Sequence, residues 1–207
     1  MGRFIKEIGG NIMELFFDTE FTGLYQNTTL ISLGIISLDG RYFYAEFNDY
    51  DESQVNDWIQ ENVINNLLFN DTDMYCTEEQ AFLPPYDNLC SSELHESYHT
   101  MLKGDKDSIV RDLKYWLQQF PTGEDIIIWS DCLSYDWVLF NELFGGAQNI
   151  PPNINYIPLD ICTAFKIKGI DPDISREEFI GYKIDGNKHN SLYDAKVIRE
   201  CYFKLFE

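Results

Sequence analysis

The sequence FFDTEFTGL, at residues 16–24, is the segment around which the rest of the chain is organised. The apolar residues at 13–17 predict a short buried strand that ends where this segment turns acidic. Side chains two residues apart on an extended backbone point to the same face, so Asp18 and Glu20 should lie side by side. Two carboxylates held together repel each other unless something positive lies between them. A hard divalent cation such as Mg²⁺ would meet that need, whereas the plain alternative is a solvated loop in a chain with 35 acidic residues.

The composition limits the class of protein. The chain has 207 residues, of which 44% are hydrophobic and 15% aromatic, and this favours one folded domain over residues 1–207. The formal net charge of −20 repels polyanions and so excludes broad non-specific binding to nucleic acid. A nucleic-acid partner would have to be held locally, through metal ions or a small basic patch.

The cysteines and the hydropathy indicate the compartment. The five cysteines are scattered and form no Cys-x-x-Cys pair, which favours reduced thiols and a cytoplasmic location. No apolar run is long enough to span a bilayer and no signal-peptide pattern is present, so we expect no membrane association.

Apolar patterning predicts a mixture of strands and helices. Alternating or continuous apolar runs predict strands at 13–17, 28–38, 41–47, 125–130 and 154–159. Helical spacing predicts helices at 51–68, 107–120, 133–144, 160–166 and 190–206, and Asp39-Gly40 is a hairpin signal. Residues from about 70 to 104 keep no period, and we interpret them as a surface excursion. This order predicts an α/β fold of the ribonuclease H-like type, with a mixed five-stranded sheet flanked by helices.

A second acidic point lies in SYDWV, at residues 134–138, soon after the buried strand at 125–130. Asp136 would stand near the beginning of a helix, where a carboxylate is also favoured simply by capping and by the helix dipole. Asp131 lies close by and competes with Asp136 for any functional role.

The third point is KHNSLYDA, at residues 188–195. Asp194 falls among apolar residues of the last helix, so its carboxylate should lie near the buried face and need a partner. His189 can lie on the rim of the same site, and an ordinary pKa near 6.5, which nearby acids should raise, suits a general base. Taken alone, a solvated acid and a histidine in front of a helix explain this segment equally well.

Together these points resemble the DEDDh 3′–5′ exonucleases. That family has Asp-x-Glu after the first strand, an Asp after a later strand, and His-x4-Asp at the beginning of the last helix. The resemblance covers most of the chain and is closest to the adenylate-specific exoribonuclease group (RNase AS), through DTEF at 18–21, ISLG at 31–34, DGR at 39–41 and the His-x4-Asp-Ala ending. FTGL at 21–24 also resembles the DETTG-type motif of proofreading exonucleases and oligoribonucleases. The excursion at about 70–104 looks longer than that group's pattern.

The resemblance implies a two-metal mechanism. Two Mg²⁺ or Mn²⁺ ions would be held by Asp18, Glu20, Asp136 and Asp194, with Asp18 bridging both ions. Glu20 and Asp194 would complete one ion site, and Asp136 would support the other. His189 would take the proton from the attacking water, and the product would be a nucleoside 5′-monophosphate.

The expected substrate is the 3′ end of single-stranded RNA, with a DNA 3′–5′ exonuclease of the same fold as the alternative. By resemblance, Thr22 and Leu24 would meet the terminal nucleotide. Phe21 and Tyr135 could stack on bases, and Lys188 could reach phosphates. The lysines expected to gather before the final helix are Lys166, Lys168, Lys183 and Lys188. The resemblance also favours a homodimer.

Two rival interpretations stay open at this stage. HESYH, at residues 95–99, is a literal His-Glu-x-x-His, which on a helix can bind Zn²⁺ and serve a metalloprotease. His95 and His99 lie in the polar excursion and no convincing third ligand follows, so a chance match is favoured. The other rival is a non-catalytic binding module on a nuclease fold. Loss of one acid would indicate it, but all four acids and His189 are present.

Overall fold

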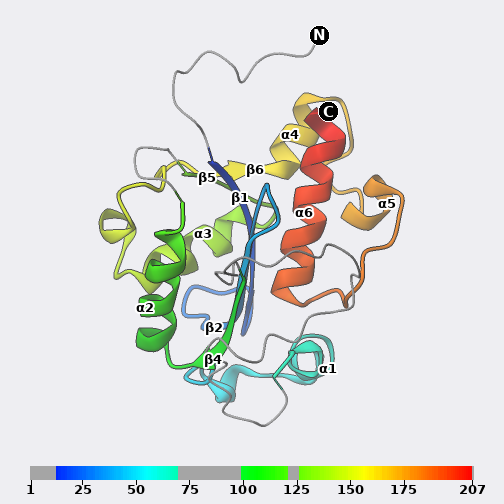
Figure 1. Ribbon diagram of the computed structural model, residues 1–207. Coiled ribbons are helices and arrows are strands. Elements are labelled where there is room, and N and C mark those ends of the chain that lie inside the picture. Colours follow the sequence, from blue (N-terminus) through cyan, green and yellow to red (C-terminus); the bar gives the residue numbers. More distant parts are fainter. Residues whose placement is uncertain (1–12, 70–98, 121–125, 207) are drawn as a thin grey trace, which may run out of the picture.

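Six strands form one mixed sheet in the computed structural model, which describes residues 13–69, 99–120 and 126–206 (Figure 1). The strands are β1 (Met13–Phe21), β2 (Leu30–Ser37), β3 (Tyr42–Phe47), β4 (His99–Gly104), β5 (Ile126–Ser130) and β6 (Leu159–Asp160). Their order across the sheet is β4-β3-β2-β1-β5-β6. β2 pairs antiparallel with both β1 and β3, and the other three pairings are parallel. The predicted mixed sheet with flanking helices is confirmed, with six strands in place of five.

Helices cover both faces of this sheet (Figure 1). α6 (Ser191–Phe206) packs over β1 and β2, on the same side as α4 (Ile161–Ile167) and α5 (Arg176–Ile180). α2 (Lys106–Leu117) and α3 (Leu133–Leu143) cover the opposite face. The side chains of β1 alternate between the two layers, as a period of two requires. Phe16 is buried in the core under α6, and Phe17 in the core under α2 and α3.

The sixth strand corrects the prediction of an excursion over 70–104. β4 pairs parallel with β3, and His99 lies opposite Tyr42. Such a pairing depends on a partner far away in the chain, so local sequence does not reveal it. Because His99 begins a strand, it does not lie on the helix that the metalloprotease interpretation requires. Residues 70–98, which include His95 itself, lie outside the described residues.

The helix predicted over 51–68 is broken into shorter pieces. These are η1 (Glu52–Gln54), α1 (Asp57–Asn62) and η2 (Ile64–Asn66). Asp51 caps η1, and the Asn56 side chain accepts a hydrogen bond from the backbone N–H of Ile59, so a new helix begins inside the predicted one. The expected apolar face survives, because Ile59 and Val63 are buried together against the sheet residue Ile31.

The strand predicted over 154–159 is also shorter than expected. Ile154 makes one isolated bridge to Ile126, and the regular strand β6 contains only Leu159 and Asp160. A short helix, η3 (Ala147–Asn149), lies between α3 and β6. After β6 the chain forms α4, then α5, and ends with α6.

Gly34 determines how closely α6 approaches the sheet. A Cβ atom at Gly34 would lie 2.3 Å from the backbone nitrogen of Leu192 and 2.3 Å from the carbonyl carbon of Ser191. Beside this contact, the hydroxyl groups of Ser32 and Ser191 are 2.9 Å apart and hydrogen-bonded. The first turn of α6 is therefore seated directly on β2, beside the carboxyl end of β1.

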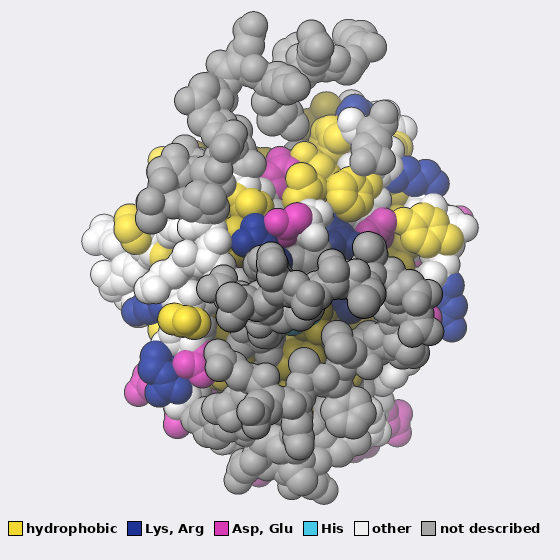
Figure 2. Space-filling model, in the orientation of Figure 1, with side chains coloured by type: hydrophobic (Ala, Val, Ile, Leu, Met, Phe, Trp, Pro, Cys, Tyr) yellow, Lys and Arg dark blue, Asp and Glu magenta, His cyan; other side chains and the backbone are white. Residues whose placement is uncertain are grey.

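Exposed apolar side chains gather at the other end of α6, where it meets α4 (Figure 2). Ile167 and Phe206 are exposed there, and with Trp129 and Leu159 they line a hollow of about 480 Å³. α6 has sixteen residues and is therefore about 24 Å long, so this end lies far from Ser191 at its beginning. Within 13–69, 99–120 and 126–206, no helix is both long and apolar enough to cross a membrane.

Candidate metal and catalytic site

Asp18 and Glu20 lie on the face of β1 that α6 covers. Asp18 is opposite Gly34 in the antiparallel register, and Glu20 is opposite Ser32. Directly opposed residues point to the same face, and Gly34 and Ser32 are the two positions that contact the first turn of α6. The expectation that both carboxylates share one face is confirmed, and the face is the one that meets the beginning of the last helix.

A first group of ligands consists of Asp18, Asp131 and Asp136, and we call it the carboxylate trio. One carboxylate oxygen from each lies within 4.8 Å of the others. Asp136 is completely buried in the first turn of α3. The Thr19 hydroxyl donates to its Oδ1 at 2.6 Å, and the Ser130 hydroxyl donates to its Oδ2 at 2.5 Å. These two hydrogen bonds fix the orientation of the Asp136 carboxylate.

Asp131 is the member of this trio that the resemblance does not include. It follows β5, and its Oδ2 lies 3.2 Å from Nε of Arg176, at the beginning of α5. The Arg176 guanidinium is held in turn by the carbonyl of Ile174 at 2.6 Å and by Sγ of Cys162 at 2.7 Å. A fixed cation thus lies on one side of an otherwise acidic group.

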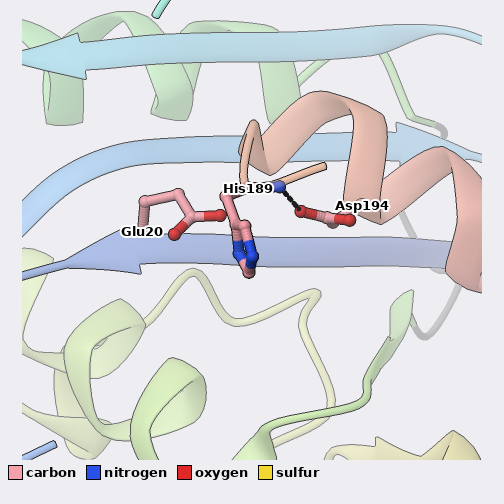
Figure 3. A group of neighbouring side chains, drawn as sticks. All are labelled: Glu20, His189 and Asp194. Carbon is pink, nitrogen blue, oxygen red and sulfur yellow. Dashed lines mark hydrogen bonds between the residues drawn. The ribbon is translucent and has the colours of Figure 1, made fainter. Parts of the chain in front are cut away.

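A second group consists of Glu20, His189 and Asp194, and we call it the histidine trio (Figure 3). One ligand atom from each again lies within 4.8 Å of the others. Glu20 extends from β1 toward the imidazole, and the backbone N–H of His189 donates to Oδ2 of Asp194 at 2.8 Å. His189 has φ +63°, a left-handed conformation uncommon for a residue with a side chain. The indole of Trp58 contacts the imidazole edge-on, with ring centroids 5.1 Å apart.

Burial raises the pKa of every carboxyl group in the two trios. Burial and the charge of Asp194 raise the pKa of Glu20 to about 9. Burial raises the pKa of Asp136 to about 7, although its two hydroxyl partners oppose the shift. Burial and a neighbouring carboxylate also raise the pKa of Asp194 to about 7. Carboxyl groups gathered in this way hold protons near neutral pH unless a cation replaces those protons, and hard divalent cations prefer such oxygen ligands. The residues present therefore fit a divalent metal.

The pKa of His189 shifts in the direction opposite to the one expected from the sequence. Partial burial lowers it, Lys188 lowers it further, and Glu177 opposes them. A lowered pKa keeps the imidazole neutral near pH 7, which is the form able to accept a proton.

The residues expected to contact substrate behave differently from one another. Thr22 is fully buried, and its hydroxyl bonds to Gln54 and to the following hairpin, so its side chain is engaged within the protein, and its contact with a nucleotide stays a prediction. Leu24 is 71% exposed beside the same segment. Phe21 and Tyr135 stack on each other with centroids 5.4 Å apart, so each ring already has an aromatic partner.

The predicted gathering of four lysines is also wrong. Lys168 lies over the ring of Phe206, at the C-terminal end of α6. Lys188 stands before the N-terminal end of that helix, 4.0 Å from a carboxylate oxygen of Glu177. Proximity in sequence failed here because Lys168, at the end of α4, and Lys188, just before α6, lie at opposite ends of one long helix.

Sequence reasoning missed the residues that hold the site in place. Thr19 and Ser130 orient Asp136, Arg176 pairs with Asp131, and Trp58 flanks His189. Only the positions of two of these residues in the sequence could have indicated such a role. Thr19 stands between the two acids of β1, and Ser130 is the last residue of β5. Asn190 was missed as well. Its side chain accepts from the backbone N–H of Tyr193 and donates to Asn66 and Tyr44, which ties the beginning of α6 to its neighbours.

Nucleases are among the known proteins to which the chain is similar in sequence. No protein-family model matches the chain. A 3′–5′ exoribonuclease of Mycobacterium tuberculosis strain CDC 1551 is 26% identical over 184 residues, which span 89% of this chain and 88% of that protein. A 3′–5′ exoribonuclease of strain H37Rv matches with the same identity and coverage.

One solved structure shares the fold. It is described as 3′-end specific recognition of histone mRNA stem-loop by 3′-exonuclease, and it matches with a TM-score of 0.57 at 13% identity. The match covers 94% of this chain, which spans 63% of that one. The chain is therefore an α/β protein of the ribonuclease H-like type, and its acidic site stands where β1 and β5 end and α6 begins.

Proposed function

We propose that the protein is a metal-dependent 3′–5′ exonuclease of the DEDDh type that acts on single-stranded RNA. The observation that supports this most strongly is that the carboxylate trio and the histidine trio lie where β1 and β5 end and α6 begins, close enough for the carboxyl groups of one trio to raise the pKa of those in the other. The 3′–5′ exoribonucleases that resemble the chain over 89% of its length support the reaction class and the choice of RNA.

Two divalent cations, Mg²⁺ or Mn²⁺, fit the ligands of this site. Asp18, Glu20, Asp136 and Asp194 are the proposed ligands, and Asp131 is placed to join Asp18 and Asp136. When bound, such ions polarise the scissile phosphodiester and stabilise the charge on the attacking and leaving oxygens. The chain contributes the rigid positions of these carboxylates. Thr19 and the first turn of α6 hold them in place before any substrate arrives.

His189 is the proposed general base. Its imidazole lies at the rim of the site beside Glu20, and it is partly exposed, so an attacking water can reach it. The neutral imidazole accepts the proton of that water, and the hydrolysed product leaves as a nucleoside 5′-monophosphate. The contact with Trp58 and the hydrogen bond to Asp194 limit the positions that the ring can adopt.

Digestion of end-labelled strands tests this function. The purified protein is given 5′-labelled single-stranded RNA, or DNA of the same sequence, with Mg²⁺, Mn²⁺ or EDTA. We expect a ladder that shortens from the 3′ end of the RNA, requires the divalent cation, and releases 5′-monophosphates. Asp18→Asn should abolish the ladder. Asp107→Asn is the matched control, since it removes one exposed carboxylate from α2 on the opposite face.

The outcomes separate the candidate functions. Faster digestion of DNA than RNA would replace the proposal with a DNA exonuclease of the same fold. A folded wild-type protein that digests neither strand would refute the nuclease and favour a binding module. The homodimer and the cytoplasmic location stay predictions. Light scattering on the purified protein measures the first, and cell fractionation the second.

A further inference from the structure

His189 has a backbone conformation that must be held by other parts of the chain. Its φ of +63° lies in the left-handed region, which a residue with a side chain adopts seldom and keeps only where surrounding contacts fix it. In this conformation the imidazole lies beside Glu20 in the histidine trio (Figure 3). The contacts that hold the two neighbours of His189 therefore determine where the proposed base lies.

Asn66 is bonded to both of these neighbours. Its Nδ2 donates to the backbone carbonyl of Lys188 at 3.1 Å. Its own backbone carbonyl accepts a hydrogen bond from Nδ2 of Asn190, also at 3.1 Å. Asn66 thus holds the residue before His189 and the residue after it, while the N–H of His189 itself donates to Asp194.

The segment that carries Asn66 is anchored to the sheet. Asn66 is the last residue of η2, and its Nδ2 also donates to the carbonyl of Asn62 at 2.5 Å. Just beyond it, the backbone N–H groups of Leu68 and Phe69 donate to Oε1 of Glu46, at 2.6 and 3.0 Å. Glu46 is completely buried in β3. The Asn66 side chain therefore extends from a fixed support and not from a loose loop.

A second connection joins Glu46 to the other side of His189. The Tyr44 hydroxyl donates to Oε1 of Glu46 at 2.8 Å and accepts from Nδ2 of Asn190 at 3.2 Å. Because Asn190 is also bonded to Asn66, these four residues form a closed polar network behind a partly exposed histidine. Buried polar groups that are bonded to one another in this way restrict each other's motion.

We propose that Asn66 is a positioning residue that fixes the imidazole of His189 for proton transfer. This inference rests on the proposed function, because it assumes that His189 is the general base. The accepting nitrogen of a general base must lie within hydrogen-bond reach of the attacking water, and a misplacement of about 1 Å costs about 100-fold in rate. The side chain of Asn66 donates to Asn62 and Lys188, so its loss should displace the histidine and leave the four proposed metal ligands in place.

The imidazole signal of His189 tests the inference without any digestion. The chain has three histidines, and His189→Gln identifies the signal that belongs to this residue. A ¹H–¹³C spectrum of the imidazole groups is recorded in EDTA at pH 8, where the ring is neutral. We expect Asn66→Ala to shift the His189 signal or to split it in two, and to leave the signals of the other two histidines in place. An unchanged His189 signal would overturn the proposal.

Asn65→Ala is the matched control. It removes the same kind of side chain from the neighbouring position of η2, where that side chain is exposed and accepts from Nε2 of Gln60 at 3.1 Å. The His189 signal should stay as in the wild type. An equal change in Asn65→Ala would show that the signal reports a general loosening of η2, and this would overturn the proposal.

Asn66→Ser separates the bond to Lys188 from the bond within the helix. A serine hydroxyl can bond to the carbonyl four residues earlier, here that of Asn62, but it is too short to replace the bond to Lys188. This variant should melt close to the wild type and still change the His189 signal as Asn66→Ala does. A wild-type signal in Asn66→Ser would contradict the assignment.

Kinetics distinguishes positioning from a purely structural role. With Mn²⁺ and single-stranded RNA, Asn66→Ala should lower kcat by about tenfold and leave KM within about twofold of the wild type. In the His189→Gln background the same substitution should cause no further loss, because the effects of residues that act through one another are not additive. A tenfold loss in both backgrounds would show that Asn66 merely supports the fold, and the proposal would be overturned.

The inference and the proposed function fail in different ways. A wild-type protein that digests RNA, with an Asn66→Ala variant that matches it in kcat and in the His189 signal, would refute the positioning role and leave the nuclease intact. A wild-type protein that digests no strand would refute the nuclease, and the role of Asn66 in proton transfer would fall with it.

Discussion

Replacing Gly34 with alanine is expected to separate the last helix from the sheet and to disable the site without touching a metal ligand. The added Cβ would lie 2.3 Å from the backbone of both Ser191 and Leu192. Because these neighbours are backbone atoms, no side chain can rotate away, and the contacts must lengthen by more than about 1 Å to reach ordinary van der Waals separation. The first turn of α6, which carries Asp194, has to move by that amount.

The size of this displacement sets the expected loss of stability and the expected loss of digestion rate. Overpacking of this kind costs about 1–3 kcal/mol, which for a chain of this size lowers the melting temperature by roughly 2–12 °C. A displacement of about 1 Å at reacting groups costs about 100-fold in rate. Thermal unfolding in EDTA measures the first effect, and the Mn²⁺-dependent rate of RNA digestion, taken well below the melting temperature, measures the second.

Ser32→Ala is the matched control for Gly34→Ala. It removes the hydrogen bond between Ser32 and Ser191 beside the same contact, and it adds no atom. We expect a loss of about 1 kcal/mol and a digestion rate within a few-fold of the wild type. A Gly34→Ala protein with wild-type melting and wild-type digestion would refute the close seating of α6 on β2 and the positioning argument built on it.

Three further predictions concern the charged groups. Without metal, the melting temperature should fall as pH rises from about 5 to about 8. In the folded protein the pKa of Asp136 is raised to about 7, so the protonated form stabilises the fold at low pH. This stability is lost as the pH rises through that value. A melting temperature that rises over this range in EDTA would contradict the prediction. Asp18→Asn should abolish digestion and yet raise the melting temperature in EDTA at pH 8, because burial and then the neighbouring carboxylates disfavour the charged form of Asp18. A lower melting temperature of the variant would contradict this. His189→Gln should lower the digestion rate by about 100-fold or more while calorimetry still detects Mn²⁺ binding; loss of metal binding would assign His189 as a ligand instead of a base.

The local parts of the fold could be predicted from the sequence. The strand before Asp18, the turn at Asp39-Gly40 and the amphipathic helix α2 follow from patterns contained in a few neighbouring residues. The placement of Asp18 and Glu20 on one face followed from the period of two alone. Physical pattern was sufficient wherever the determining contacts lie close together in the chain.

The remaining parts depend on partners distant in sequence. β4 forms because β3 offers a free edge, and no pattern within residues 99–104 distinguishes that strand from an irregular loop. The burial of Thr22 depends on Gln54, and the fixed position of Asp131 depends on Arg176. The division of the acids into two trios could not be predicted either, because it depends on how β1, α3 and α6 pack together in three dimensions. Tertiary contacts of this kind leave no local signal.

The central claim is that the two trios hold divalent cations that hydrolyse the strand. Crystals grown with Mn²⁺ test it most directly, through anomalous diffraction measured near the manganese absorption edge. The account predicts two anomalous peaks, one among the oxygens of Asp18, Asp131 and Asp136 and one beside Glu20 and Asp194. Crystals of the Asp18→Asn variant should lose at least the first peak. Manganese bound only elsewhere on the protein, with both trios free of anomalous density, would contradict the account.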